Sequence, residues 1–102
     1  MSTAAEQETN WAVGITSKAR KQLERLPPDI TDALAALWMD LKFSGPVQPH
    51  WLNYGKLKGR KDEYHCHLKK GRPTYVAVWK VLNKQIRLME IYYVGTHENA
   101  PY

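Results

Sequence analysis

The sequence has one cysteine, Cys66, and only short apolar runs. One cysteine excludes an internal disulfide, and no stretch approaches the roughly 18 apolar residues of a transmembrane helix. Residues 1–10 have neither the basic segment nor the apolar segment of a signal peptide. We therefore expect a soluble cytoplasmic protein that makes no contact with a membrane.

Internal repeats and low-complexity segments are also missing. A chain of 102 residues is long enough for one hydrophobic core and too short for two domains. Its hydrophobic content of 43%, with four tryptophans and six tyrosines, excludes disorder for most of its length. Residues 1–10 are polar and lack periodicity, so we predict a disordered tail followed by a single domain over residues 11–102.

Positive charge is concentrated in one part of the chain. Residues 56–72 contain seven basic and two acidic residues, so this segment accounts for the whole net charge of +5. Such an excess indicates an anionic partner, most often a nucleic acid. A solvated lysine-rich loop that maintains solubility explains the charge alone equally well. The candidate RNA-binding residues are Lys56, Lys58, Arg60, Lys61, Lys69 and Lys70.

Hydrophobic periodicity predicts two helices after a short strand at residues 11–16. The first helix covers residues 18–26 and is capped by Ser17. The second begins at Pro28 and stops at Gly45, and its apolar residues recur at the helical period. These residues are Ile30, Ala33, Leu34, Leu37, Trp38 and Leu41.

Three strand-like runs follow a polar connection and cover residues 62–68, 74–82 and 85–95. The connections KKGRP and NK have hairpin length, so the strands should form an antiparallel meander. The order β-α-α-β-β-β predicts an α+β fold in which two helices cover one face of a four-stranded, mainly antiparallel sheet. The other face should remain partly open.

The segment EYHCHLKKGRP places two histidines and the cysteine on one strand. Side chains alternate along a strand, so Tyr64, Cys66 and Leu68 should face the helices. His65 and His67 should then lie on the open face, about 7 Å apart at the rise of a strand. Polar residues on an exposed strand face are the ordinary explanation of such a pair.

A metal site is a second interpretation of the histidine pair. A zinc site needs three or four protein ligands, and the other candidates are His50, Glu90 and His97. No ligand spacing completes the set, and Cys66 should point away. We therefore expect neither a metal nor a cofactor.

Imidazoles near fixed positive charges suit the cleavage of RNA by its own 2′-hydroxyl. This reaction needs a base, an acid for the 5′ oxygen and cations that stabilise the phosphorane. Histidine has a pKa of about 6.5 and can act as the base or as the acid. Neighbouring cations disfavour its charged form. We expect His97 to join His65 and His67, with Arg72 as a cation. The candidates for stacking on bases are Tyr54, Tyr93 and Tyr102. Packing in the core or at its rim better explains Tyr54 and Tyr93.

From Trp11 to Tyr102 the chain resembles the RelE/ParE toxins of bacterial toxin-antitoxin systems. The resemblance rests on KLKG before the second strand, on EYHCHLKKGRPTYVAVWKV and on the C-terminal YVGTHENAPY. It implies a small α+β toxin that is neutralised by a cognate acidic antitoxin, with operator DNA contacted only through the antitoxin complex. In the RelE branch it implies an endonuclease that cuts mRNA in the ribosomal A site.

The resemblance also implies roles for individual residues. His65 and His67 stand where RelE-type toxins have catalytic lysines, and His97 lies where they keep a basic residue. Tyr102 matches their terminal stacking tyrosine. The arginine expected early in the third strand is replaced at position 75 or 76, so its phosphate-clamping role would move to Arg72 or Lys80.

Three hypotheses about function follow. The first is a metal-independent mRNA endonuclease that depends on the ribosome, favoured by three histidines near the basic segment. The second is a ParE-like inhibitor of DNA gyrase, which binds a protein and needs no acid-base residues. The third is an RNA-binding module without catalysis.

Overall fold

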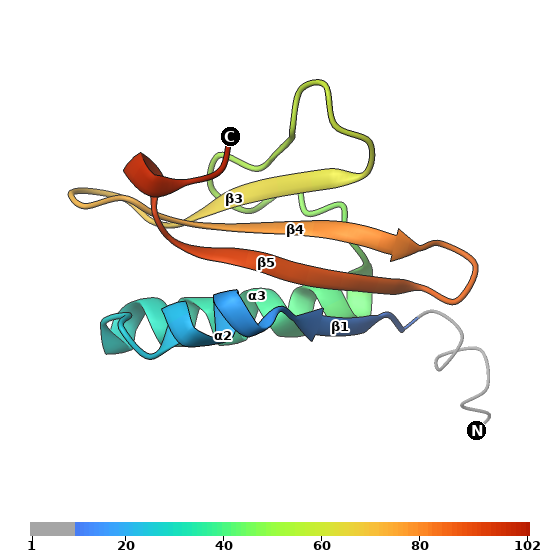
Figure 1. Cartoon of the computed structure of the whole chain (residues 1–102), viewed down its shortest axis with the longest axis horizontal. Coiled ribbons are helices and arrows are strands. Elements are labelled where there is room, and N and C mark those ends of the chain that lie inside the picture. Colours follow the sequence, from blue (N-terminus) through green and yellow to red (C-terminus); the bar gives the residue numbers. More distant parts are fainter. Residues whose placement is uncertain (1–9) are drawn as a thin grey trace.

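The computed structural model describes residues 10–102, which form two helices against one face of a five-stranded sheet (Figure 1). The helices are α2 (Ser17–Leu23) and α3 (Pro28–Ser44), and a short 3-10 helix, η1 (His97–Asn99), follows the last strand. The strands are β1 (Ala12–Ile15), β2 (Gly55–Lys56), β3 (Glu63–Lys69), β4 (Tyr75–Asn83) and β5 (Leu88–Thr96). The predicted α+β class is confirmed. The predicted tail lies, apart from Asn10, outside the described residues.

The strand order in the sheet is β1-β5-β4-β3-β2. Strand β1 pairs with β5 in parallel, and all other pairs are antiparallel, which confirms the predicted meander of β3, β4 and β5. The predicted sheet lacked β2, a strand of two residues inside the polar connection. Two residues are too few for an alternating pattern, so the sequence gives no signal for this strand.

Within residues 10–102, no helix is long and apolar enough to cross a membrane.

The apolar face of α3 forms the core with the sheet. Ile30, Leu34, Leu37 and Leu41 are buried in one cluster with side chains of β3, β4 and β5, so the predicted helical pattern is confirmed. The helix stops at Gly45, as predicted, where the backbone has a φ of 90° and the N–H donates to the Leu41 carbonyl at 2.9 Å.

Two side chains of the polar connection between α3 and β3 are buried. Gln48 is fully buried, and its Nε2 donates to the carbonyls of Asp40 and Gly45 at 3.0 and 2.8 Å. Leu57 is also buried, but on the opposite face of the sheet, in a small cluster with Val76, Val78 and Tyr93. The face away from the helices therefore has an apolar cluster of its own.

The hairpin between β4 and β5 is longer than the predicted two-residue NK connection. Strand β5 begins at Leu88, later than the predicted start at residue 85. The Asn83 side-chain oxygen accepts hydrogen bonds from the N–H groups of Gln85 and Ile86 at 2.9 and 3.2 Å. This local turn competes with strand pairing, and the left-handed Arg87, with a φ of 51°, completes it.

The cap of α2 is Thr16, so the predicted Ser17 cap is wrong. The Thr16 hydroxyl oxygen accepts a hydrogen bond from the N–H of Ala19 at 3.1 Å. Thr16 directly follows β1 and keeps an extended backbone, with φ of −69° and ψ of 157°, as a cap requires. Ser17 is already the first helical residue, and α2 ends at Leu23 instead of residue 26.

We predict that Thr16→Ala lowers the free energy of unfolding by about 1 kcal/mol, because the Ala19 N–H loses its partner. The matched change Ser17→Ala should alter it by less than about 0.5 kcal/mol, because Ser17 is exposed. Urea denaturation of both variants measures the difference. Equal losses would contradict the assignment of Thr16 as the cap.

Candidate functional site

The side chains of β3 alternate between the two faces of the sheet. Tyr64, Cys66 and Leu68 are 7%, 0% and 8% exposed and belong to the core cluster under the helices. His65 and His67 are half-buried and lie on the opposite face. The predicted orientation of both sets is therefore correct.

On this face three imidazoles and a phenol ring form what we call the histidine cluster: His65, His67, His97 and Tyr102. The ring centroids of His67 and His97 are 5.6 Å apart, and those of His65 and Tyr102 are 4.9 Å apart. His97 and Tyr102 are separated by 6.0 Å. The cluster joins β3 to η1 and the C-terminal segment, as the sequence led us to expect.

Backbone geometry on both sides fixes the members of the cluster. The His97 N–H donates to the Thr74 carbonyl at 2.8 Å, which places η1 next to the β3–β4 hairpin. Gly55 of β2 pairs with His65, and a β-carbon at Gly55 would lie 3.1 Å from the His65 Nε2. Glycine thus leaves room for this imidazole. Sequence analysis missed Gly55, because strand pairing across a loop leaves no local pattern.

Arg60 holds the C-terminal segment over the sheet. Its guanidinium donates to the Tyr92 hydroxyl at 3.2 Å and to the Pro101 carbonyl at 2.8 Å. The Tyr92 hydroxyl donates to the Glu63 carboxylate at 2.6 Å, which lies 3.6 Å from Arg60. Arg60 therefore makes contacts within the protein that position the C-terminal segment, and its contact with RNA stays a prediction. The sequence could have indicated Glu63, because it lies two residues before His65 on β3 and therefore on the same face of the sheet.

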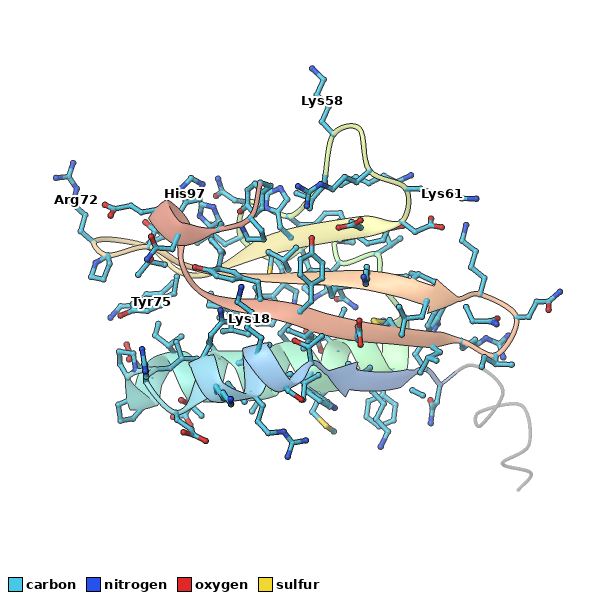
Figure 2. All side chains as sticks on the ribbon, viewed as in Figure 1. Lys18, Lys58, Lys61, Arg72, Tyr75 and His97 are labelled. Atoms are coloured by element: carbon cyan, nitrogen blue, oxygen red, sulfur yellow. The ribbon has the colours of Figure 1, made fainter. Side chains whose placement is uncertain are left out.

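Within residues 10–102, none of the remaining predicted lysines is bonded to a ring of the histidine cluster. Figure 2 shows Lys58 and Lys61 extending from the loop before β3, and Arg72 at the opposite end of the sheet. Lys69 bonds Asp29 at 2.8 Å, so its predicted role in RNA binding competes with an ion pair to α3. Lys56 and Lys70 are exposed.

Arg72 lies beside the cluster, whereas Lys80 contacts Tyr92, which is not a member of the cluster. Arg72 and His97 line one hollow of about 550 Å³, together with Thr74 and Thr96. The Lys80 ammonium lies over the Tyr92 ring, 5.5 Å from its centroid. Of the residues that could replace the missing arginine of the third strand, Arg72 is the one that shares a hollow with a histidine of the cluster.

Burial lowers the pKa of His65, and the neighbouring His67 and His97 lower it further. The pKa of His67 is lowered by burial and by His97. A lowered pKa agrees with the expectation from the sequence, but burial and neighbouring histidines cause it instead of neighbouring lysines and arginines. No hydrogen bond or ion pair within residues 10–102 joins a lysine or arginine to these rings.

Cys66 is fully buried on the helix side, and burial raises the pKa of its thiol to about 12. It is therefore a core residue and not a nucleophile. His50 lies outside the histidine cluster, 3.5 Å from the Asp40 carboxylate. No group of three His, Cys, Asp or Glu side chains in the described part of the chain could hold a metal ion.

Of the three tyrosines considered for stacking, Tyr102 is the accessible one. Tyr54 packs against Tyr64 and Trp79 of the core, with ring centroids 6.1 and 6.3 Å apart. Tyr93 is 8% exposed and donates to the Thr96 carbonyl at 2.7 Å. Tyr102 is 43% exposed beside His65.

We predict that Arg60→Ala releases Tyr102 from His65, because both hydrogen bonds of the guanidinium are lost. Nuclear Overhauser contacts between the two rings should disappear, while the free energy of unfolding falls by less than about 1 kcal/mol. Lys58→Ala removes a cation from the same loop and should change neither property. Contacts that persist without Arg60 would show that apolar packing alone holds the segment.

The lowered pKa values also predict a dependence of stability on pH. Below the ordinary pKa of 6.5, the unfolded chain binds protons that the folded His65 and His67 do not. Their contribution to stability is therefore complete above pH 6.5 and is lost as the pH falls toward the folded-state pKa. Unfolding at about pH 7.5 and about pH 5 should show this loss in the wild type and a smaller one in His65→Gln/His67→Gln. Thr16→Ala is the control, and a double variant with the wild-type slope would refute the attribution.

No family sequence model matches this chain, and no curated protein is detectably similar to it in sequence. Solved structures are nevertheless similar in fold. RelE from the archaeal RelE-RelB complex of Pyrococcus horikoshii OT3 superposes with a TM-score of 0.71 at 22% identity, over 89% of this chain and 99% of that one. The isolated E. coli RelE toxin superposes with a TM-score of 0.66 at 20% identity, over 89% of this chain and 88% of that one.

YoeB from a Staphylococcus aureus dimer gives a TM-score of 0.67 at 12% identity, over 86% of this chain and 98% of that one. The similarity therefore extends over nearly the whole described chain and over nearly the whole length of each toxin. Identities this low show the architecture, and on that basis the chain has the α+β fold of the RelE toxins.

Proposed function

We propose that this chain is the toxin of a toxin-antitoxin pair and a metal-independent endoribonuclease that cleaves mRNA on the ribosome. The histidine cluster is the observation that supports this most directly. It combines three imidazoles and an accessible tyrosine on the sheet face that the helices leave uncovered. The fold shared with RelE toxins supports the same function.

In the proposed reaction His67 acts as the base and His97 as the acid. His67 takes the proton of the RNA 2′-hydroxyl, and the 2′ oxygen forms a bond to phosphorus. The bond from phosphorus to the 5′ oxygen breaks, and that oxygen takes the proton of His97. The products are a 2′,3′-cyclic phosphate and a 5′-hydroxyl, so no water is consumed. The separation of 5.6 Å between the two rings suits contact with one phosphate group.

The environment of each imidazole fits its role. Burial lowers the pKa of His67 and keeps it neutral near pH 7, the form that a base requires. His97 is exposed and shares its hollow with Arg72, whose guanidinium would stabilise charge on the phosphorane. His65 stacks beside Tyr102 and is assigned to holding the substrate next to the reacting pair.

The proposed substrate contacts are aromatic and ionic. The Tyr102 ring is exposed and free to stack on a base next to the cut. Four exposed lysines would contact phosphates of the mRNA or the ribosome, and they are Lys56 of β2 and Lys58, Lys61 and Lys70 of the loops. A cognate acidic antitoxin would cover the same basic surface, and operator DNA would be bound only by that complex.

We predict that His67→Ala and His97→Ala each reduce mRNA cleavage about 100-fold or more, the usual loss for an acid or base. Primer extension on ribosome-bound transcripts measures cleavage, and growth arrest on expression measures toxicity. His50→Ala is the matched control, because His50 lies outside the histidine cluster.

Full toxicity in both variants would contradict the nuclease and favour a ParE-like gyrase inhibitor. A wild type that binds RNA but never cleaves it would favour a non-enzymatic RNA-binding module.

A further inference from the structure

A second hollow, which we call the α2–β5 groove, has a volume of about 720 Å³ and lies between α2 and the C-terminal half of β5. Strand β1 pairs only with Leu88 to Ile91, so on this edge of the sheet α2, and not a strand, lies next to the rest of β5. Gln22 bridges the two elements at the groove, where its side-chain oxygen accepts the Val94 N–H at 3.0 Å. The volume lies in the range of about 300–1,000 Å³ found for ligand pockets.

One wall of the groove is basic. Lys18 and Gln22 of α2 line it, together with Arg25, which lies in the turn after the helix ends at Leu23. Figure 2 shows Lys18 extending from α2 toward β5. Neither Lys18 nor Arg25 forms an ion pair with an acid in residues 10–102, and none of the lining residues is acidic. Both charges are therefore available to an anion.

The other wall is aromatic. Tyr75, Tyr92 and Tyr93 line it, together with Asn99 and Pro101 of the C-terminal segment. Tyr75 is half-buried, so part of its ring faces the groove. A basic wall opposite aromatic rings is the combination that binds single-stranded nucleic acid, in which phosphates meet cations and bases stack.

The groove adjoins the hollow that contains His97 of the histidine cluster. Thr96 lines both the α2–β5 groove and the hollow that Arg72 and His97 share. An RNA strand that leaves the groove at Thr96 would therefore be next to His97, which lines the second hollow together with Arg72.

We propose that the α2–β5 groove binds the nucleotides of single-stranded RNA that flank the cleaved bond. Lys18 and Arg25 would bind their phosphates, and Tyr75 would contact a base. This inference rests on the proposed function and adds the path of the substrate. An acidic peptide could also pair with the two cations, but the aromatic wall and the connection to His97 favour RNA.

The test compares two double variants in α2 and the turn that follows it. Lys18→Ala/Arg25→Ala removes the charges that line the groove, and Arg20→Ala/Lys21→Ala removes two exposed charges that do not. The probe is a single-stranded oligoribonucleotide with a 2′-deoxy residue at the cut site, which prevents attack by the 2′-hydroxyl. Its affinity is measured at several salt concentrations, and the unfolding midpoint confirms that each variant is folded.

The slope of log affinity against log salt is negative, and it should become shallower by about 1.4 in Lys18→Ala/Arg25→Ala, at about 0.7 per lost phosphate contact of a single strand. It should stay near the wild-type value in Arg20→Ala/Lys21→Ala. Tyr75→Ala should weaken binding about tenfold through the loss of one stacked base.

Equal slopes in the two double variants would overturn the inference, even if the wild type cleaves RNA. Weaker binding of an acidic peptide with unchanged RNA binding would overturn it in favour of a peptide site. A wild type that binds the probe through Lys18 and Arg25 but cleaves no transcript would support the groove and refute the nuclease.

Discussion

Burial of one face of β3 against α3 is the constraint on which the rest of the structure depends. Tyr64 and Cys66 pack in the same core as Leu34 and Leu37, next to the ring of Trp79. A shift of one residue in β3 would expose these side chains and bury the histidines, at a cost of several kcal/mol of apolar burial. The core therefore determines that His65 and His67 face away from the helices.

The rest of the histidine cluster depends on weaker interactions. His97 and Tyr102 belong to a segment that crosses the sheet and is held by hydrogen bonds of Arg60 and of Thr74. Each such bond contributes only about 1 kcal/mol, far less than the core beneath β3. Half of the cluster is thus placed by the core and half by a tether at the surface, which makes Arg60 as relevant to its geometry as the imidazoles.

Charge and proton transfer are separated in space. His65 and His67 are half-buried, and burial and the neighbouring imidazoles lower their pKa, whereas Lys18 lies on α2 and Arg72 on a loop. In the proposed function, cations at a distance would bind flanking phosphates without pairing with the imidazoles. This arrangement differs from the one implied by the order of residues, in which Lys69 and Arg72 directly follow His67.

The sequence alone determined the two helices, the meander and the orientation of His65 and His67. Each is set by which residues along a short segment are buried, and periodicity records this directly. Only the tertiary structure decided the partner of each polar group. Lys69 bonds Asp29 across 40 positions and Arg60 bonds Pro101 across 41, while Thr16 and not Ser17 caps α2. A polar side chain has several possible partners, and the folded backbone selects among them by distance, so no local pattern can reveal the choice.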